Sequence, residues 1–286
     1  MQRSVTSLGE TLACAIADLG AAKVGSSRLN AEVLLMFTLD VDRAYLYAHP
    51  ERELNADESQ RYHQLIQQRS QGVPSQYITG HQEFWGMDLI VTPAVLIPRP
   101  ETEHLIEAVL PLAKPMQAPR IVDVGTGSGG IALALAKELP RAEIHATDIS
   151  PDALEIAEAN AARHQLANRI RFHDTDLLKE LASNSFDFVI SNPPYVGSCE
   201  EDQVQLEVRK FEPRNAVFAG PTGLEVIERL VPEALRVLKP KGWLALEVSG
   251  TIAAGVEKLL HGWESVEVKP DLQGIARVVL ARRPIS

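Results

Sequence analysis

The sequence predicts an α/β fold with a mainly parallel sheet, preceded by a small helical domain. From Arg120 onward, short apolar runs that are typical of buried strands alternate with segments of helical periodicity. Such alternation is typical of a parallel sheet with helices on both faces. Between Ser7 and about Arg69 the apolar residues follow only the helical period, and a stretch rich in turn residues separates the two patterns.

The amino-terminal region is predicted to be a helical domain over residues 1–73. Apolar residues recur there at three- and four-residue steps, in Leu8, Leu12, Ile16 and Leu19 and again in Leu29, Val33, Leu34 and Phe37. Asn55 or Asp57 is suited to cap a later helix that ends near Gln71. The pattern fits both a domain that only stabilises its neighbour and a domain that docks a partner.

A β-hairpin linker is expected over residues 74–97. Three short segments bounded by turn residues indicate β structure in this stretch, namely Tyr77–Gly80, Phe84–Gly86 and Leu89–Val91. The composition differs from that of the helical region before it, so the domain boundary is placed here.

The carboxyl-terminal domain is expected over residues 98–286. It opens with Pro98-Arg99-Pro100-Glu101-Thr102-Glu103, and the apolar residues that follow have helical spacing. Pro100 suits the first turn of that helix, where Glu101 and Glu103 interact favourably with the positive end of the helix dipole. We expect Arg99 to belong to a structural clamp at the domain junction, with Glu247 as a candidate partner.

Strand and helix patterns then alternate to the end of the chain. The expected strands are Arg120–Val124, Glu143–Thr147, Ile170–His173, Phe186–Ser191, Trp243–Val248, Ser265–Val268 and Ala276–Leu280. The expected helices are Gly129–Leu139, Pro151–His164, Thr222–Leu238 and Ile252–Leu260.

A glycine-rich loop follows the first of these strands and predicts a nucleoside site. The loop residues are Gly125, Thr126, Gly127, Ser128 and Gly129. Glycines there permit a tight turn and close approach of a ligand, and Asp148, about twenty residues on, can accept both ribose hydroxyl hydrogens. The spacing of Gly125, Gly127 and Gly130 is also compatible with a nicotinamide dinucleotide. The acid Asp123 before the loop, and the end of the fourth strand, favour S-adenosylmethionine instead.

The fourth strand ends in Asn192-Pro193-Pro194-Tyr195, at the sheet edge where α/β proteins bind ligands. The two prolines end the strand and leave carbonyl oxygens that a ligand donor could reach. The Asn192 amide, these carbonyls and the Tyr195 ring are thus expected to lie together at a ligand site.

Composition restricts the possible partners. The 28 basic and 38 acidic residues give a net charge of −10, which argues against nucleic acid as the main partner. Cys14 and Cys199 have neither disulfide-framework nor metal-ligand spacing, and none of the eight histidines forms a metal motif. Met1–Ser4 shows no leader pattern, and no apolar run is long enough to span a bilayer. We expect a cytoplasmic protein without a metal or a membrane partner.

Taken together, these motifs resemble the HemK/PrmC protein-(glutamine-N5) methyltransferases, which modify peptide chain release factors. The resemblance covers nearly the whole chain. It rests on Tyr77–Gly80, Leu96–Glu103, Asp123–Gly129, Asn192–Tyr195, Phe211–Arg214, Gly223-Leu224 and Asp271–Gly274. The Asn-Pro-Pro-Tyr motif alone is shared with adenine-N6 DNA methyltransferases, whereas the Pro-Arg-Pro-Glu-Thr-Glu segment and the helical amino-terminal region are specific to the family.

The resemblance implies a Rossmann-like, seven-stranded class I methyltransferase domain whose last strand is antiparallel, joined by a β-hairpin linker to the helical domain. It implies an S-adenosyl-L-methionine site at Gly125–Gly129, Asp148, Asp176, Leu177 and Asn192. Where relatives carry a large aromatic residue, this chain has Leu177, so aliphatic contact to adenine is expected. The chain also departs from the family pattern at Ser249 and at Ile275-Ala276.

The implied substrate is the glutamine of the Gly-Gly-Gln motif in release factors, which the helical domain holds in part. The resemblance places this glutamine at Asn192, Pro193, Pro194 and Tyr195. The Asn192 side-chain oxygen and the Pro193 carbonyl would accept the two N–H hydrogens of its planar amide, and Tyr195 would stack on the amide, so Asn192, Pro193 and Tyr195 are the candidate catalytic residues. We expect the enzyme to be a monomer.

Three alternatives stay open. One is glutamine methylation of a ribosomal protein, and another is adenine-N6 methylation of DNA. The third is a cofactor-binding regulator without catalytic activity, which would have no need of Asn192.

Overall fold

The computed structural model describes residues 7–285, which form two compact units. The first unit comprises the described residues up to Gly80 together with Leu206–Phe211. The second comprises His81–Gln205 and the described residues from Glu212 on. The expectation that Met1–Ser4 holds no leader concerns residues outside the described range.

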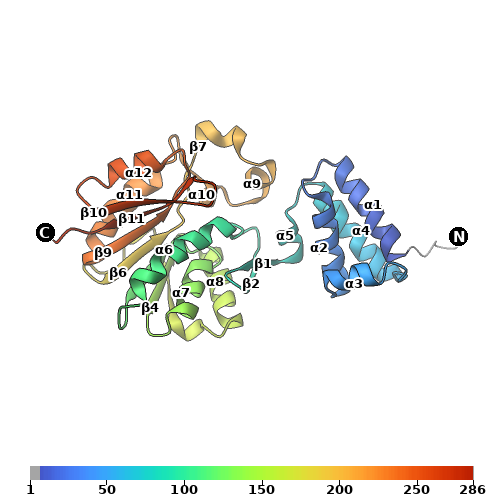
Figure 1. Ribbon diagram of the computed structural model, residues 1–286, viewed down its shortest axis with the longest axis horizontal. Helices are drawn as coiled ribbons and strands as arrows, with labels where there is room; N and C mark the ends of the chain where they lie inside the picture. The colour runs from blue at the N-terminus through green and yellow to red at the C-terminus, as the bar shows by residue number, and fades with distance from the viewer. Residues whose placement is uncertain (1–6, 286) are drawn as a thin grey trace. The chain divides into compact units, whose positions relative to one another are not determined.

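The first unit is helical, as predicted (Figure 1). Its helices are α1 (Leu8–Ala21), α2 (Ser27–Leu39), α3 (Arg43–Ala48), α4 (Ala56–Ser70), α5 (Ser75–Thr79) and α9 (Leu206–Phe211). The Asn55 side chain caps α4 in a reciprocal pair with Glu58, which confirms one of the two caps considered for this helix. Leu8, Leu34 and Tyr62 are among the buried residues that form the core of the bundle.

The prediction of a β segment at Tyr77–Gly80 is wrong. Ser75–Thr79 is helix α5, which follows Pro74, and Gly80 ends it in the left-handed conformation with φ of +79°. A glycine with positive φ is a common way to end a helix. Two adjacent apolar residues, Tyr77 and Ile78, are too few to distinguish a strand from a single helical turn.

Helix α9 comes from a distant part of the sequence, and Arg69 of α4 holds it in the first unit. The Arg69 side chain is buried, and its Nη2 donates to Glu207 Oε1 at 2.6 Å. Its Nε donates to Asn30 Oδ1 at 2.7 Å and its Nη1 to the Val73 carbonyl at 3.2 Å. The guanidinium is thus paired within a buried setting, where an unpaired charge would be strongly destabilising.

The second unit contains a seven-stranded sheet in the order β10-β11-β9-β6-β3-β4-β5. The strands are β3 (Arg120–Val124), β4 (Glu143–Asp148), β5 (Ile170–Asp174), β6 (Phe186–Ser191), β9 (Leu238–Glu247), β10 (Glu264–Pro270) and β11 (Ala276–Arg282). Pairing is parallel from β9 to β5, and β11 is antiparallel to both of its neighbours. The predicted seven strands and the antiparallel last strand are confirmed.

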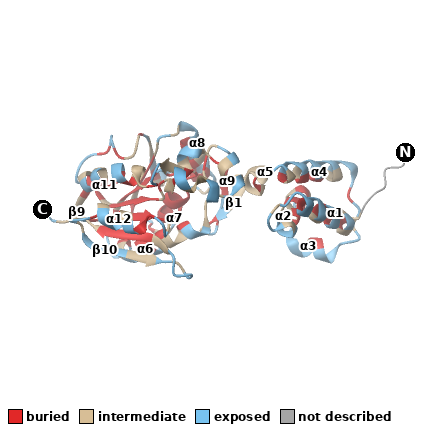
Figure 2. Ribbon diagram, turned by 90° about the horizontal axis from the view of Figure 1, so that it is seen from above, coloured by how far each residue is buried: buried red, intermediate tan, exposed pale blue. Residues whose placement is uncertain are grey.

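Helices cover both faces of this sheet (Figure 1). One core combines sheet residues with α6 (Glu103–Ala113), α7 (Gly130–Glu138) and α8 (Pro151–Arg163), and the other with α11 (Glu225–Val237) and α12 (Ala253–Leu259). Neighbouring strand residues alternate between the two cores, so that Ile121 joins the first and Val122 the second. The inner strands β3, β4, β6 and β11 are accordingly mostly buried, whereas the edge strand β10 is mostly exposed (Figure 2).

Smaller elements complete the second unit. Strands β1 (His81–Phe84) and β2 (Met87–Ile90) form the predicted hairpin, which turns at Trp85 and Gly86 with φ of +53° and +64°. The elements that sequence patterns did not indicate are β7 (Val196–Gly197), β8 (Phe218–Gly220), α10 (Arg214–Val217) and the 3₁₀ turns Pro100–Thr102, Ala167–Arg169 and Ser198–Gln203. They are short, and most of them follow the Asn-Pro-Pro-Tyr segment.

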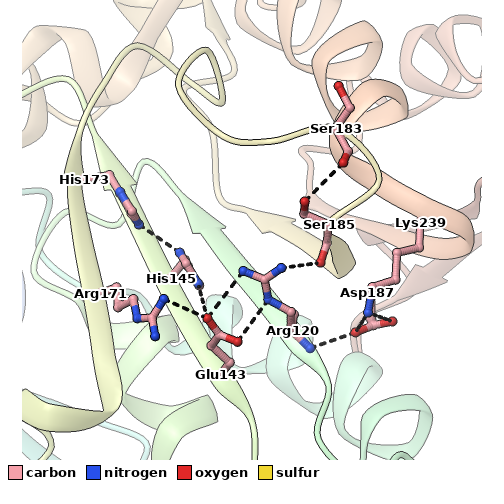
Figure 3. A network of polar contacts seen from close by, with 9 residues as sticks. All are labelled: Arg120, Glu143, His145, Arg171, His173, Ser183, Ser185, Asp187 and Lys239. Carbon is pink, nitrogen blue, oxygen red and sulfur yellow. Dashed lines mark hydrogen bonds and ion pairs between the residues drawn. The ribbon is translucent and has the colours of Figure 1, made fainter.

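A polar network ties together the amino ends of the central strands (Figure 3). Glu143 of β4 forms ion pairs with Arg120 of β3 at 3.0 Å and with Arg171 of β5 at 3.0 Å. His145 lies between Glu143, 3.1 Å away, and His173, 2.8 Å away. Burial lowers the pKa of both histidines, so both are neutral at pH 7. We call these residues the amino-end network.

Within residues 7–285, none of the helices combines the length and the apolar character that a membrane span requires. Cys14 and Cys199 are both free thiols at the surface. Among the same described residues there is no cluster of three or more histidine, cysteine or acidic side chains arranged to hold a metal ion.

Candidate functional site

Two adjoining clefts lie at the carboxyl ends of β3, β4 and β6. The larger cleft, with about 1060 Å³ of open space, is lined by Gly125, Asp148 and Asn192 from these three strand ends. The smaller cleft, of about 420 Å³, shares Gly125 and Asn192 with it and extends to Arg99 and Thr102. The sheet grows from β3 in opposite directions, through β4 on one side and β6 on the other. Ligands of α/β proteins bind at such switch points.

The glycine loop has the open backbone that its sequence predicts. Gly125 and Gly127 have φ of +70° and +55°, and a Cβ added at either would meet no atom within 4 Å. The empty space beside them belongs to the clefts, because both glycines line both clefts. Thr126 and Ser128 line only the smaller cleft. Gly129 lines neither, and a Cβ there would lie 3.2 Å from Ala157 Cβ, so its close packing requires glycine.

Asp123 stabilises the glycine loop through hydrogen bonds. It is fully buried, and its Oδ2 accepts hydrogen bonds from Thr126 Oγ1 at 2.6 Å and from the Ala132 amide at 3.2 Å. Burial raises the pKa of Asp123 to about 7, although these two hydrogen bonds act in the opposite direction. Because Asp123 lines neither cleft, it shapes the loop and does not face a ligand.

Asp148 faces the larger cleft from the end of β4. Its Oδ2 accepts the Gly127 amide at 2.9 Å and its Oδ1 accepts the Ser150 amide at 3.0 Å, which fixes the carboxylate beside the glycine loop. Burial raises the pKa of this carboxyl group. The next residue, Ile149, lines the same cleft and is 59% exposed. A carboxylate with an apolar surface beside it is suited to a ribose with its base.

Asp176 and Leu177 line the far side of the larger cleft. The Asp176 carboxylate is engaged by Lys179 and Arg229, each at 2.5 Å, and its pKa is lowered chiefly by the hydrogen bond from Lys179. Leu177 has a φ of +56°, which is unusual for a branched residue and turns the chain at the cleft wall. These two residues lie at the cleft where the resemblance placed them.

Asn192 lies where the two clefts meet. Its Nδ2 donates to Thr102 Oγ1 at 3.0 Å, and no hydrogen bond to its Oδ1 is present among the described residues. Pro194 lines the larger cleft, whereas Pro193 is buried and lines neither cleft. Neither proline has an N–H to occupy neighbouring acceptors. The Asn192 oxygen therefore remains available to an N–H donor.

The Tyr195 side chain is held in place by a buried acid, Glu247. Its hydroxyl donates to Glu247 Oε1 at 3.3 Å, and Glu247 Oε2 has no hydrogen-bond partner in the described part of the chain. Burial raises the pKa of Glu247 to about 7, against the effect of the Thr102 and Tyr195 hydroxyls. Burial also raises the pKa of Tyr195, and the nearby Glu247 charge adds to this.

The suggested pairing of Arg99 with Glu247 is wrong. Arg99 instead forms an ion pair with Glu212, a buried carboxylate whose Oε2 also accepts the Ile97 amide at 3.2 Å. Glu247 is 1% exposed and faces Tyr195, so it is not the surface carboxylate that was also considered. The likeness of Phe211–Arg214 to its family pattern was the only signal that pointed towards Glu212.

Two residues that line the clefts, Thr102 and Ile149, and one that pairs with a lining residue, Glu212, were not identified from the sequence as site residues. Thr102 contacts Asn192 across 90 positions of sequence, and Glu212 contacts Arg99 across 113 positions. No local pattern reveals such contacts. Ile149, by contrast, directly follows the predicted Asp148, so an apolar residue next to the ribose acid was a usable signal.

The larger cleft fits an S-adenosyl group. Gly125 and Gly127 leave room where side chains would fill it, Asp148 offers carboxylate oxygens, and Ile149 and Leu177 offer apolar walls. The cavity volume of this cleft, about 290 Å³, is near the lower end of the range found for small-molecule sites, about 300–1,000 Å³. The smaller cleft extends the open space past Asn192. The polar end of an S-adenosyl ligand would need such an extension.

Comparison with known proteins agrees with this interpretation. The family model of the PrmC N-terminal domain matches residues 10–80, and that of the methyltransferase small domain matches residues 102–209. The chain is 54% identical over 273 residues to the release factor glutamine methyltransferase of Koribacter versatilis, covering 95% of this chain and 97% of that protein. It is 42% identical over 279 residues to the enzyme of the same name from Moorella thermoacetica, covering 96% and 98%.

Solved structures agree on the fold. The hMettl16 catalytic domain, in complex with the MAT2A 3′UTR hairpin 6, has a TM-score of 0.57 at 18% identity, covering 84% of this chain and 92% of that one. A methyltransferase from Pyrococcus furiosus has a TM-score of 0.52 at 19% identity, covering 70% and 90%. The cofactor is S-adenosyl-L-methionine, and the chain belongs to the release factor glutamine methyltransferase family.

Proposed function

We propose that this enzyme transfers a methyl group to the side-chain amide nitrogen, N5, of the glutamine in the Gly-Gly-Gln motif of peptide chain release factors. The observation that carries the proposal is the state of Asn192, whose nitrogen is bound by Thr102 and whose oxygen is available at the junction of two clefts. An oxygen in that position accepts an N–H. The names of the relatives support a release factor as the protein that supplies it.

An amide nitrogen is a poor nucleophile because its lone pair is delocalised into the carbonyl group. Complete loss of that conjugation would cost about 18–20 kcal/mol, by analogy with rotation of a peptide bond. The Asn192 Oδ1 and the Pro193 carbonyl oxygen would accept the two N–H hydrogens. They would hold the nitrogen in place and stabilise the positive charge that develops on it. The N–C bond would form as the sulfonium–methyl bond breaks, and the methylated amide would then lose one N–H proton to water or a nearby acceptor.

Tyr195 and Pro194 would wall the planar amide on its faces. The hydrogen bond from Tyr195 to Glu247 restricts the rotation of the phenol ring, and the ring of Pro194 is rigid by nature. A rigid wall improves the alignment of the nitrogen lone pair, and alignment is a large part of the rate enhancement in such transfers. Asn192, Pro193 and Tyr195 are thus the proposed catalytic residues.

The proposed cofactor-binding residues are those that surround the larger cleft and its loop, namely Gly125, Thr126, Gly127, Ser128, Gly129, Asp148, Asp176, Leu177 and Asn192. When bound, S-adenosyl-L-methionine supplies an electrophilic methyl group. Asp148 would accept the ribose hydroxyl hydrogens. Because Lys179 and Arg229 already hold the Asp176 carboxylate, Asp176 would contribute mainly the position of its backbone and of Leu177.

The helical amino-terminal region, proposed over residues 1–73, would contribute to docking of the release factor, with residues 74–97 as its connection to a transferase domain over residues 98–286. The enzyme would act as a monomer in the cytoplasm, where release factors function, with a protein and not a nucleic acid as its substrate. The net charge of −10 is consistent with this choice of substrate.

The test is incubation with methyl-labelled S-adenosyl-L-methionine and a purified release factor, followed by mass spectrometry of the Gly-Gly-Gln peptide. We expect one methyl group on the glutamine and none on a release factor in which that glutamine is replaced. A ribosomal protein preparation and duplex DNA serve as competing substrates. Label that appears only in one of these, with a cofactor-binding enzyme, would refute the proposal.

A further inference from the structure

Thr102 lies where the 3₁₀ turn Pro100–Thr102 continues into α6. Its backbone is already helical, with φ of −66° and ψ of −21°, and its side chain makes no capping hydrogen bond. Its hydroxyl oxygen accepts the Nδ2 hydrogen of Asn192 at 3.0 Å, and the residue is only 5% exposed. Thr102 and Asn192 both line the smaller cleft, so this contact lies at the proposed site.

This contact matters because the two ends of a carboxamide are chemically opposite. Oδ1 is an acceptor and Nδ2 carries two donor hydrogens. If the Asn192 amide turned over, Nδ2 would take the place of Oδ1 at the clefts. The proposed substrate also presents N–H groups there, and two donors cannot form a hydrogen bond. The orientation of this one amide therefore decides whether the site accepts a glutamine nitrogen.

We propose that Thr102 is a positioning residue that holds the Asn192 amide with its oxygen towards the substrate. The proposal stands on the 3.0 Å hydrogen bond from Asn192 Nδ2 to Thr102 Oγ1, which leaves Asn192 Oδ1 without a partner among residues 7–285. This inference rests on the proposed function, because the orientation matters only if Asn192 accepts a substrate N–H.

The experiment compares Thr102→Ser, which keeps the hydroxyl, with Thr102→Ala and Thr102→Val, which lack it. We expect kcat on a purified release factor to fall about 10- to 100-fold in the Ala and Val variants, as loss of a partner for a buried polar group would produce. The Ser variant should stay within about threefold of the wild type. Affinity for S-adenosyl-L-methionine, measured by titration calorimetry, should change by less than about threefold in all three.

Thr38→Val is the matched control, since that buried hydroxyl donates to the Leu34 carbonyl of its own helix at 2.7 Å. Its kcat should not change. Wild-type kcat in the Ala or Val variant, or equal losses in the Ser and Ala variants, would overturn the inference. If the Val variant does not fold, the Ser and Ala pair decides alone. A wild-type enzyme that leaves the release factor unmethylated would refute the proposed function instead, before any substitution is compared.

Discussion

The two ends of the central strands carry polar clusters of opposite character. At the amino ends, Glu143 pairs with two arginines and with His145, and Asp187 pairs with Lys239 at 2.8 Å (Figure 3). At the carboxyl ends, Asp123 and Glu247 are buried, and each has one carboxylate oxygen without a hydrogen-bond partner among the described residues. The same sheet therefore has an electrostatically satisfied end and an unsatisfied one.

The pKa shifts express this difference. The hydrogen bond from His145 lowers the pKa of Glu143, whereas burial raises the pKa of Asp123 and of Glu247, in both cases to about 7. Carboxyl groups with strongly shifted pKa are concentrated at functional sites, and burial disfavours the ionised form of both Asp123 and Glu247. The amino-end network contributes to stability, whereas Asp123 and Glu247 hold the glycine loop and Tyr195 beside the clefts.

The largest expected effect belongs to Asn192→Ala. Loss of the amide removes one of the two proposed acceptors for the substrate N–H groups, and kcat should fall by at least about 10²–10³-fold, as it does when one preorganised partner of a reacting group is removed. Affinity for S-adenosyl-L-methionine should fall much less, by about tenfold at most, because Gly125, Gly127 and Asp148 of the proposed cofactor site are unchanged. Methyl transfer to the release factor and titration calorimetry measure the two quantities.

The matched control for this variant is Asp187→Asn, near the other end of β6. It removes an ion pair with Lys239 and should lower stability while leaving kcat unchanged. Turnover by Asn192→Ala at the wild-type rate would contradict the assignment of chemistry to the carboxyl end. A large loss of kcat in Asp187→Asn would contradict the assignment of a purely structural role to the amino ends of the strands.

Local patterns predicted the framework well, because the strands of a parallel sheet are local apolar runs. β3 and β6 begin and end where their sequences indicate, at Arg120–Val124 and Phe186–Ser191. The glycine loop and Asp148 were predicted for the same reason, since each directly follows a strand. Tyr77–Gly80 was misassigned because two adjacent apolar residues show no period that separates a strand from a helix. The segment is helical and ends at Gly80, which has a left-handed backbone conformation.

Contacts between distant segments could not be predicted in this way. Asn192 was identified from its motif, but the Thr102 hydroxyl that holds it lies 90 positions away. Glu247 was expected beside Arg99 and is found against Tyr195. A carboxylate at a strand end has several possible neighbours, and only the packing of β9 against β6 chooses among them.

The next effect in size concerns the pH dependence of stability at Glu247. Its pKa is 4.5 in the unfolded reference and about 7 in the folded protein, so the folded state binds the proton more tightly. Its contribution to stability is present below pH 4.5 and is lost as the pH rises through 7. Between pH 5 and pH 8 this amounts to about 2–3 kcal/mol.

Glu247→Gln removes the titrating group and should reduce that decline. Chemical unfolding at pH 5, 6.5 and 8 should show the variant gaining on the wild type as the pH rises. Asp123 has a similarly raised pKa and remains in both proteins, so the difference between their stability curves isolates Glu247. Parallel curves would show that Glu247 does not titrate in this range.

A smaller effect is expected for Asp148→Asn. The amide keeps the shape of the carboxylate but presents N–H groups where the proposed ribose hydroxyls and the Gly127 amide need an acceptor. Affinity for S-adenosyl-L-methionine should fall about 10- to 100-fold. Asp152→Asn, the same chemical change at an exposed position outside both clefts, should leave it unaltered. Equal calorimetric affinities for the two variants would remove Asp148 from the cofactor site.

The smallest effect, and the one that tests the amino end itself, belongs to His145→Gln. Burial lowers the pKa of His145, so the unfolded state binds the proton more tightly, and the stability linked to this group is present above pH 6.5 and lost as the pH falls. This sign is opposite to that of Glu247. At pH 8, glutamine should cost about 1 kcal/mol or less, because it can still bond to Glu143. At pH 5.5 that cost should shrink or reverse, with kcat unchanged throughout. Unfolding curves with the same difference at both pH values would show that His145 is not a titrating part of the network.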